Sequence, residues 1–145
     1  MIYLGADHAG YNLKEEIKKY LGQLGLEFED LGNKDLDAGD DYPDFAVKVA
    51  KKVAETGEKG ILFCGSGVGM AIAANKIKGI RAVACWDDFT AIQSREHLDA
   101  NILCLGGRTM DAETAKKIVR LWLETEFSKE ERHVRRLRKI KEMEK

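Results

Sequence analysis

The sequence is poor in several features that mark particular protein classes. It has one proline and three widely spaced cysteines in 145 residues, which argues against linkers, a disulfide framework and a paired-cysteine zinc site. Lysine and arginine (24) balance aspartate and glutamate (25), so no basic field favours nucleic acid. No window approaches the roughly 20 apolar residues of a membrane-spanning helix, and the N-terminus does not resemble a signal peptide. We therefore expect a cytoplasmic protein with no nucleic-acid or membrane partner.

Apolar runs alternate with amphipathic stretches along the whole chain. With 44% hydrophobic residues, the length fits one globular domain, residues 1–145. Alternation of strands and helices predicts an α/β fold in which a five-stranded parallel sheet is covered on both faces. Gly25 and Gly57 are placed to end two of the helices. The expected strands are 2–5, 26–31, 61–64, 81–85 and 102–105, and the expected helices are 11–24, 43–57, 68–76, 88–97 and 111–125.

The C-terminal segment, residues 128–145, differs from the rest in composition. Val134, Leu137, Ile140 and Met143 recur at every third position within a highly charged sequence. Such a narrow apolar stripe suits packing on a partner surface better than filling a core. We therefore expect an extended terminal helix that contacts a second copy of the chain.

Polar and glycine residues follow the predicted strands. They are 7–10 after the first strand, 64–69 after the third, 86–88 after the fourth and 106–108 after the fifth. Because parallel α/β sheets bind ligands at the carboxyl ends of their strands, this clustering favours a site at one edge of the sheet.

Residues 60–70, GILFCGSGVGM, allow several interpretations. A dinucleotide fingerprint would need glycine where Met70 stands, although Asp87 lies about 20 residues on, where a ribose-binding acid is expected. A phosphate loop of a cysteine phosphatase would need arginine at the position of Met70. Met70 therefore weakens the dinucleotide interpretation and excludes the phosphatase interpretation.

An anion site with an adjacent base fits the same residues. Backbone N–H groups from Gly65 to Gly69, at the start of a helix, form a concavity for negative charge. Their field would favour the Cys64 thiolate, and Ser66 could donate a further hydrogen bond. A tight turn whose glycines serve only close packing stays an equal alternative. Cys85 and Cys104 are expected to be buried hydrophobes.

Histidines and arginines supply further candidates. His8, beside Asp7, could bind a phosphate or a hydroxyl, and His97 lies near a predicted helix end. Arg132 and Arg136 share a helical face and could grip one phosphate, although a solvated basic face is the commoner explanation. His133 is expected to be solvated.

Five separated motifs together resemble the ribose-5-phosphate isomerase B family, which belongs to a wider group with the galactose-6-phosphate isomerase subunits. The motifs occur in the family's order from the first strand to the terminal helix. They are GADHAG (5–10), DYPDFA (41–46), CGSGVGMAIAANKIKGIRA (64–82), SREH (94–97) and RHVRR (132–136).

The resemblance implies a Rossmann-like three-layer α/β/α fold and an aldose–ketose isomerase that needs no metal or cofactor. Ribose 5-phosphate and ribulose 5-phosphate would be interconverted, with Cys64 as the base and His97 assisting ring opening. The active site would be shared between the subunits of a homodimer or tetramer. The implied substrate contacts are Asp7, His8, Tyr42, Gly65, Ser66, Gly67, Val68, Gly69, Arg108, Arg132 and Arg136, where Gly65 to Gly69 with Ser66 form the anion hole.

Two positions depart from common family patterns. One branch uses a glutamate base where this chain has Met70, so Cys64 is the candidate base here. Many members have asparagine where this chain has Leu98, which leaves the sugar open. The alternatives are a 6-phospho-hexose isomerase and a non-catalytic phosphosugar-binding module.

Overall fold

The computed structural model of the protein, which describes residues 1–144, contains one parallel sheet of five strands in the order β2-β1-β3-β5-β4. The predicted α/β architecture is confirmed. The strands are β1 (Ile2–Ala6), β2 (Phe28–Asp30), β3 (Lys59–Cys64), β4 (Ala82–Ala84) and β5 (Ile102–Gly106). The three central strands, β1, β3 and β5, are almost wholly buried, which explains their continuous apolar sequence.

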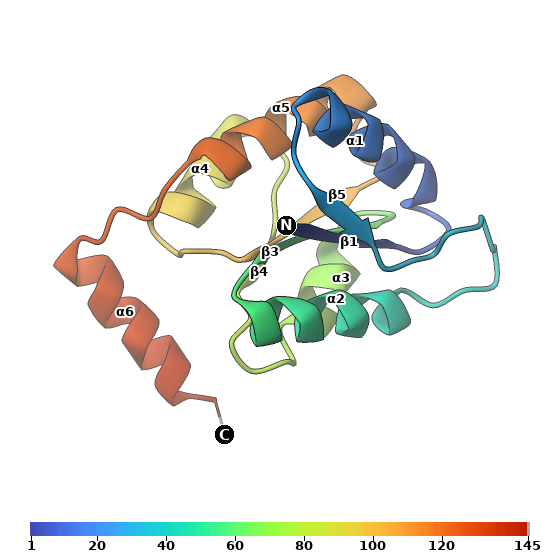
Figure 1. Cartoon of the computed structure of the whole chain (residues 1–145). Helices are drawn as coiled ribbons and strands as arrows, with labels where there is room; N and C mark the ends of the chain where they lie inside the picture. Colours follow the sequence, from blue (N-terminus) through green and yellow to red (C-terminus); the bar gives the residue numbers. More distant parts are fainter. Residues whose placement is uncertain (145) are drawn as a thin grey trace.

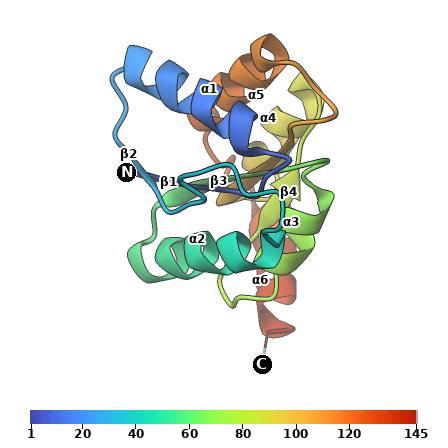
Figure 2. The same ribbon diagram turned by 90° about the vertical axis from the view of Figure 1, so that its right-hand side faces the viewer.

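Helices cover both faces of the sheet (Figures 1 and 2). One layer holds α1 (Tyr11–Gln23), α4 (Asp88–Glu96) and α5 (Ala112–Glu124), and the other holds α2 (Tyr42–Thr56) and α3 (Val68–Ala74). Each layer closes its own core: Leu13, Ile17 and Trp122 pack on one face of the sheet, and Val49 and Met70 on the other. None of the helices described is both long and apolar enough to cross a membrane.

Helix ends follow the sequence signals closely. Gly57 ends α2 with a left-handed φ of 74°, the conformation for which glycine is the favoured residue. Asp87 accepts the N–H of Thr90 and caps α4. The carboxylate that a dinucleotide interpretation would assign to a ribose therefore has a structural role in α4.

The terminal helix α6 (Glu131–Glu142) extends away from the two layers (Figure 1). Val134, Ile140 and Met143 on its apolar stripe are 43%, 47% and 73% exposed. Between α6 and the body lies a groove of about 520 Å³, with Ile77, Ile80, Val83, Leu98, Leu137, Ile140 and Met143 in its lining. As the stripe predicted, this helix leaves apolar surface uncovered within one chain.

Candidate active site

The candidate site lies at the carboxyl ends of the neighbouring strands β1 and β3, whose following helices lie on opposite faces of the sheet. The turn after β1 leads into α1 on one face, and the turn after β3 leads into α3 on the other. Turns that diverge in this way open a crevice between neighbouring strands. A cleft of about 500 Å³ lies there, lined by Asp7, His8, Ala9, Tyr42, Cys64, Gly65, Ser66, Gly69, Arg108 and Thr109.

Glycines allow the three turns to approach one another. A Cβ on Gly10 would come within 2.3 Å of the Phe63 backbone, and one on Gly107 within 2.4 Å of the Ala9 carbonyl. The Gly107 N–H donates to the Cys64 carbonyl at 2.7 Å, and the Arg108 N–H to the Gly65 carbonyl at 3.0 Å. The turn after β5 is thereby fastened to the turn after β3, which fixes Arg108 beside Cys64.

Cys64 is the last residue of β3 and lines the cleft. Its side chain is 5% exposed, and its sulfur accepts the Gly67 N–H at 3.2 Å. A hydrogen bond donated to the sulfur supports negative charge on it. Gly67 adopts a φ of +83°, which only glycine takes readily, so this turn places an N–H at the thiol. The other two cysteines are also buried, as expected, and burial raises the pKa of the Cys85 and Cys104 thiols.

The turn that follows Cys64 carries the exposed hydroxyl of Ser66 and a glycine, Gly69, that packs against Tyr42. Ser66 is exposed, and its hydroxyl accepts the Val68 N–H at 3.3 Å. A Cβ on Gly69 would lie 2.8 Å from the Tyr42 ring. Gly69 therefore allows Tyr42 to cover the beginning of α3. Val68 is exposed at 53% but is not among the residues that line the cleft.

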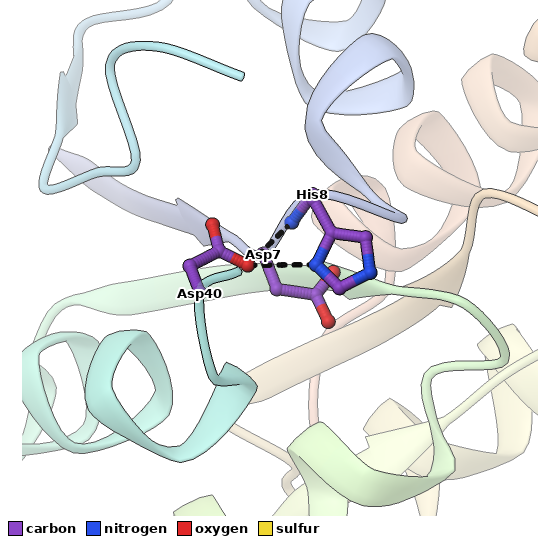
Figure 3. A group of neighbouring side chains, drawn as sticks. All are labelled: Asp7, His8 and Asp40. Carbon is purple, nitrogen blue, oxygen red and sulfur yellow. Dashed lines mark hydrogen bonds and ion pairs between the residues drawn. The ribbon is translucent and has the colours of Figure 1, made fainter. Parts of the chain in front are cut away.

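Asp7 and His8 line the cleft, and Asp40 lies against His8 (Figure 3). Asp7 is buried, and one of its carboxylate oxygens accepts the N–H groups of Ala9 and Gly10 at 3.0 and 3.1 Å. His8 Nδ1 lies 2.8 Å from Asp40 Oδ1. This hydrogen bond raises the pKa of His8 against the opposing effect of desolvation. The cleft is thus lined by the Cys64 sulfur, the His8 imidazole and the Arg108 guanidinium.

The same three side chains hold one potential ligand atom each within 4.8 Å of one another. The hydrogen bonds already described use the Asp7 oxygen and join His8 to Asp40. The His8–Asp40 hydrogen bond and the two N–H groups that Asp7 accepts account for the way these three side chains lie together.

His97, Arg132 and Arg136 form a separate group outside the lining of this cleft, within the described residues. His97 caps α4, and its ring stacks on His133 with centroids 4.2 Å apart. Arg132 Nε donates to His133 Nε2 at 3.3 Å. Arg136, four residues along α6, is exposed. The predicted site residues therefore occur in two groups, one at the strand ends and one at the junction of α4 with α6.

His133 is a correction to the sequence analysis, which expected a solvated side chain. It is 3% exposed and bonded to the Ser128 hydroxyl at 2.8 Å. Desolvation, His97 and Arg132 together lower its pKa. Asp40 was not singled out at all, because the loop around it contains several aspartates and no pattern distinguishes one. His133 contacts His97 and Arg132, and Asp40 contacts His8.

Comparison with known proteins gives consistent matches over nearly the whole chain. Residues 2–140 match the Ribose/Galactose Isomerase family. Ribose-5-phosphate isomerase B of Mycobacterium tuberculosis is 45% identical over 94% of this chain and 85% of its own. The structure of Clostridium thermocellum ribose-5-phosphate isomerase B superposes with a TM-score of 0.94 at 48% identity, covering 99% of this chain and 96% of that one. The Mycoplasma genitalium enzyme with bound ribulose-5-phosphate gives 0.94 at 42% identity, covering 99% and 95%.

Proposed function

The chain belongs to the ribose/galactose isomerase family, and from this premise we propose that it interconverts ribose 5-phosphate and ribulose 5-phosphate. Identities of 45% and 48% to ribose-5-phosphate isomerases B support this substrate pair. The observation that carries the proposal is the cleft, which is lined by the Cys64 sulfur, by residues of the glycine-rich turn after β3 and by the His8 and Arg108 side chains. An aldose–ketose isomerase needs a base, a stabilised oxyanion and a grip on the phosphate.

Cys64 is the base in this mechanism. Its thiolate takes the proton from C2 of the open-chain aldose, while the electrons of that C–H bond form the C1–C2 double bond and the negative charge moves to the C1 oxygen. Transfer of a proton between the two oxygens and return of the carbon-bound proton to C1 complete the ketose. Backbone N–H groups from Gly65 to Gly69 and the Ser66 hydroxyl stabilise the enediolate oxygens.

The remaining candidate contacts bind the sugar and its phosphate. Asp7 and Tyr42 lie along the sugar, and His8 and Arg108 supply donors at the phosphate end of the cleft. Charge-assisted hydrogen bonds of this type orient a substrate as well as hold it. His97 assists ring opening, which precedes proton transfer because the furanose has no carbonyl group.

His97, Arg132 and Arg136 reach the cleft from a second copy of the chain in a homodimer, or in a tetramer built from such dimers. The exposed apolar stripe of α6 supports this assembly, because a partner surface that covers Val134, Ile140 and Met143 also receives the two arginines. A two-fold axis then builds two equal sites. Cytoplasmic residence and a role in pentose phosphate metabolism accompany this proposal.

Solvent exchange at C2 tests the assignment. Ribose 5-phosphate in D2O should gain deuterium with the wild type, and Cys64→Ala should slow this exchange by about 100-fold or more, the usual contribution of a general base. Cys85→Ala is the matched control, because Cys85 is a buried thiol outside the cleft. Exchange by Cys64→Ala at the wild-type rate would refute the base assignment.

Relative kcat/KM values separate the sugars. The proposal expects five-carbon phosphosugars to be preferred over allose or galactose 6-phosphate. The reverse order would make the protein a 6-phospho-hexose isomerase with the same chemistry. Binding of both sugars without exchange in the wild type would make it a phosphosugar-binding module.

A further inference from the structure

Asp40 makes two hydrogen bonds to a single residue of the cleft. Its Oδ1 accepts the His8 backbone N–H at 2.9 Å and lies 2.8 Å from His8 Nδ1 (Figure 3). The Asp40 side chain is 6% exposed, whereas that of His8 is 32% exposed. We propose that Asp40 is a positioning residue that turns His8 Nδ1 toward the β2–α2 loop and presents Nε2 to the substrate phosphate. This inference rests on the proposed function and adds to it a determinant of phosphate recognition.

The chemistry of the carboxylate decides which ring nitrogen carries the first proton. An ionised carboxylate only accepts hydrogen bonds, so the nitrogen beside it, Nδ1, must be the donor. Nε2 is then the nitrogen left for the cleft, which His8 lines together with Arg108. When the ring is charged, Nε2–H donates to a phosphate oxygen, and a charged donor makes the stronger hydrogen bond.

The loop that carries Asp40 is fastened to the sheet and to α1. Asp40 Oδ2 accepts the side-chain amide of Asn33 at 3.2 Å, and the Asn33 N–H donates to the Ala6 carbonyl at 2.9 Å. The Asn33 carbonyl accepts from Lys14, which is fully buried and bonded to Asp30 at 2.8 Å. Asp40 is thereby held in place before any ligand arrives, and preorganised contacts are the effective ones.

Charges around His8 come from each turn that borders it. Asp40 in the loop and Asp7 at the end of β1 favour the imidazolium, whereas desolvation and Arg108 after β5 oppose it. The net effect raises the pKa of His8. The imidazolium, and the phosphate binding that depends on its charge, therefore persist to a higher pH. The grip is strong below that pKa and weakens as the pH rises through it.

Asp40→Asn keeps the size of the side chain and removes its charge. With ribose 5-phosphate at neutral pH, KM should rise about fivefold to tenfold, as expected for loss of a charged donor, while kcat changes less than twofold. The alkaline rise of KM should begin at a lower pH than in the wild type. Asp35→Asn is the matched control: Asp35 is an exposed acid in the same loop whose side chain makes no hydrogen bond among the described residues.

A readout without turnover separates this inference from the isomerase assignment. In ¹⁵N-resolved spectra the neutral His8 ring should carry its proton on Nδ1, and its titration midpoint should fall in Asp40→Asn but not in Asp35→Asn. Inorganic phosphate should shift the His8 signals at about fivefold higher concentration in Asp40→Asn. An Nε2-protonated wild-type ring, or an unchanged midpoint and KM profile in Asp40→Asn, would overturn the proposal. Normal His8 titration and phosphate binding in a protein without isomerase activity would instead contradict the proposed function alone.

Discussion

Mixing two inactive variants offers the sharpest test of a site shared between subunits. Cys64→Ala removes the proposed base from the group at the strand ends, and Arg132→Ala removes a proposed phosphate ligand from the group at the junction of α4 with α6. In a hybrid dimer, one composite site receives both substitutions and the other receives neither. Activity should therefore return when the two inactive chains are dissociated, mixed and allowed to reassociate.

The size of the recovery follows from the two-fold geometry. Random pairing makes half of the dimers hybrids, and each hybrid has one intact site of two, so activity should reach about one quarter of the wild-type value. Hybrids isolated with two different affinity tags should reach about one half on the same reasoning. The assay is ribulose 5-phosphate formation per chain, with hybrid content measured by native mass spectrometry.

A matched pair of variants shows whether recovery depends on two separate groups. Cys64→Ala mixed with His8→Ala damages the strand-end group in both chains, so no site is intact and no activity should return. Arg136→Ala can replace Arg132→Ala, because Arg136 makes no hydrogen bond or ion pair in residues 1–144, whereas Arg132→Ala removes the hydrogen bond from Arg132 Nε to His133 Nε2. Hybrid dimers that form in the expected proportion but stay inactive would refute the shared site.

Two further perturbations address the supports of the site. Lys14→Met should lower the free energy of unfolding by about 2 kcal/mol at pH 7, less than a full buried pair costs because Lys18 still holds Asp30 at 2.8 Å. Burial alone would raise the pKa of Asp30, but its lysine partners lower it below 3.8. The difference in unfolding free energy between the wild type and Lys14→Met, measured in urea, should therefore shrink as the pH falls toward the Asp30 pKa and the carboxylate is protonated. A difference under about 0.5 kcal/mol at pH 7 would contradict this expectation. His133→Ala should reduce kcat about tenfold, because the His97 ring loses the ring on which it stacks. His133→Phe keeps a stacked ring, so its kcat should stay within about threefold of the wild-type value. Equal losses in the two variants would show that His133 does not contribute through stacking.

The fold could be predicted because each signal in the sequence is local. Apolar runs wholly buried in the sheet became β1, β3 and β5, and Gly25 and Gly57 end their helices in the left-handed conformation. Strand boundaries shifted by one or two residues where pairing rather than hydrophobicity sets them. The expected strand over 26–31, for example, is paired over Phe28–Asp30 alone.

The strand-end group could be predicted for a similar reason. Parallel strands bring their carboxyl ends to one edge, so His8, Cys64 and Arg108 had to be neighbours once the fold was inferred. Asp40 could not be found in this way. It lies in a loop without apolar periodicity, and its carboxylate is held by Asn33, whose carbonyl accepts a hydrogen bond from the buried Lys14, a set of contacts that no motif signals.

The two groups of site residues place different demands on the chain. As the proposed base, Cys64 has to keep a fixed position relative to the turn that follows it, and at the buried end of β3 its sulfur accepts the Gly67 N–H. As proposed phosphate ligands of a partner's cleft, Arg132 and Arg136 have to extend beyond their own chain, and α6 lies outside the two layers (Figure 1). Because the uncovered stripe and the arginines lie on the same helix, the contact that buries the first also delivers the second. If the proposed dimer forms, assembly and phosphate binding depend on the same helix, so we expect substitutions that remove the stripe to weaken phosphate binding as well.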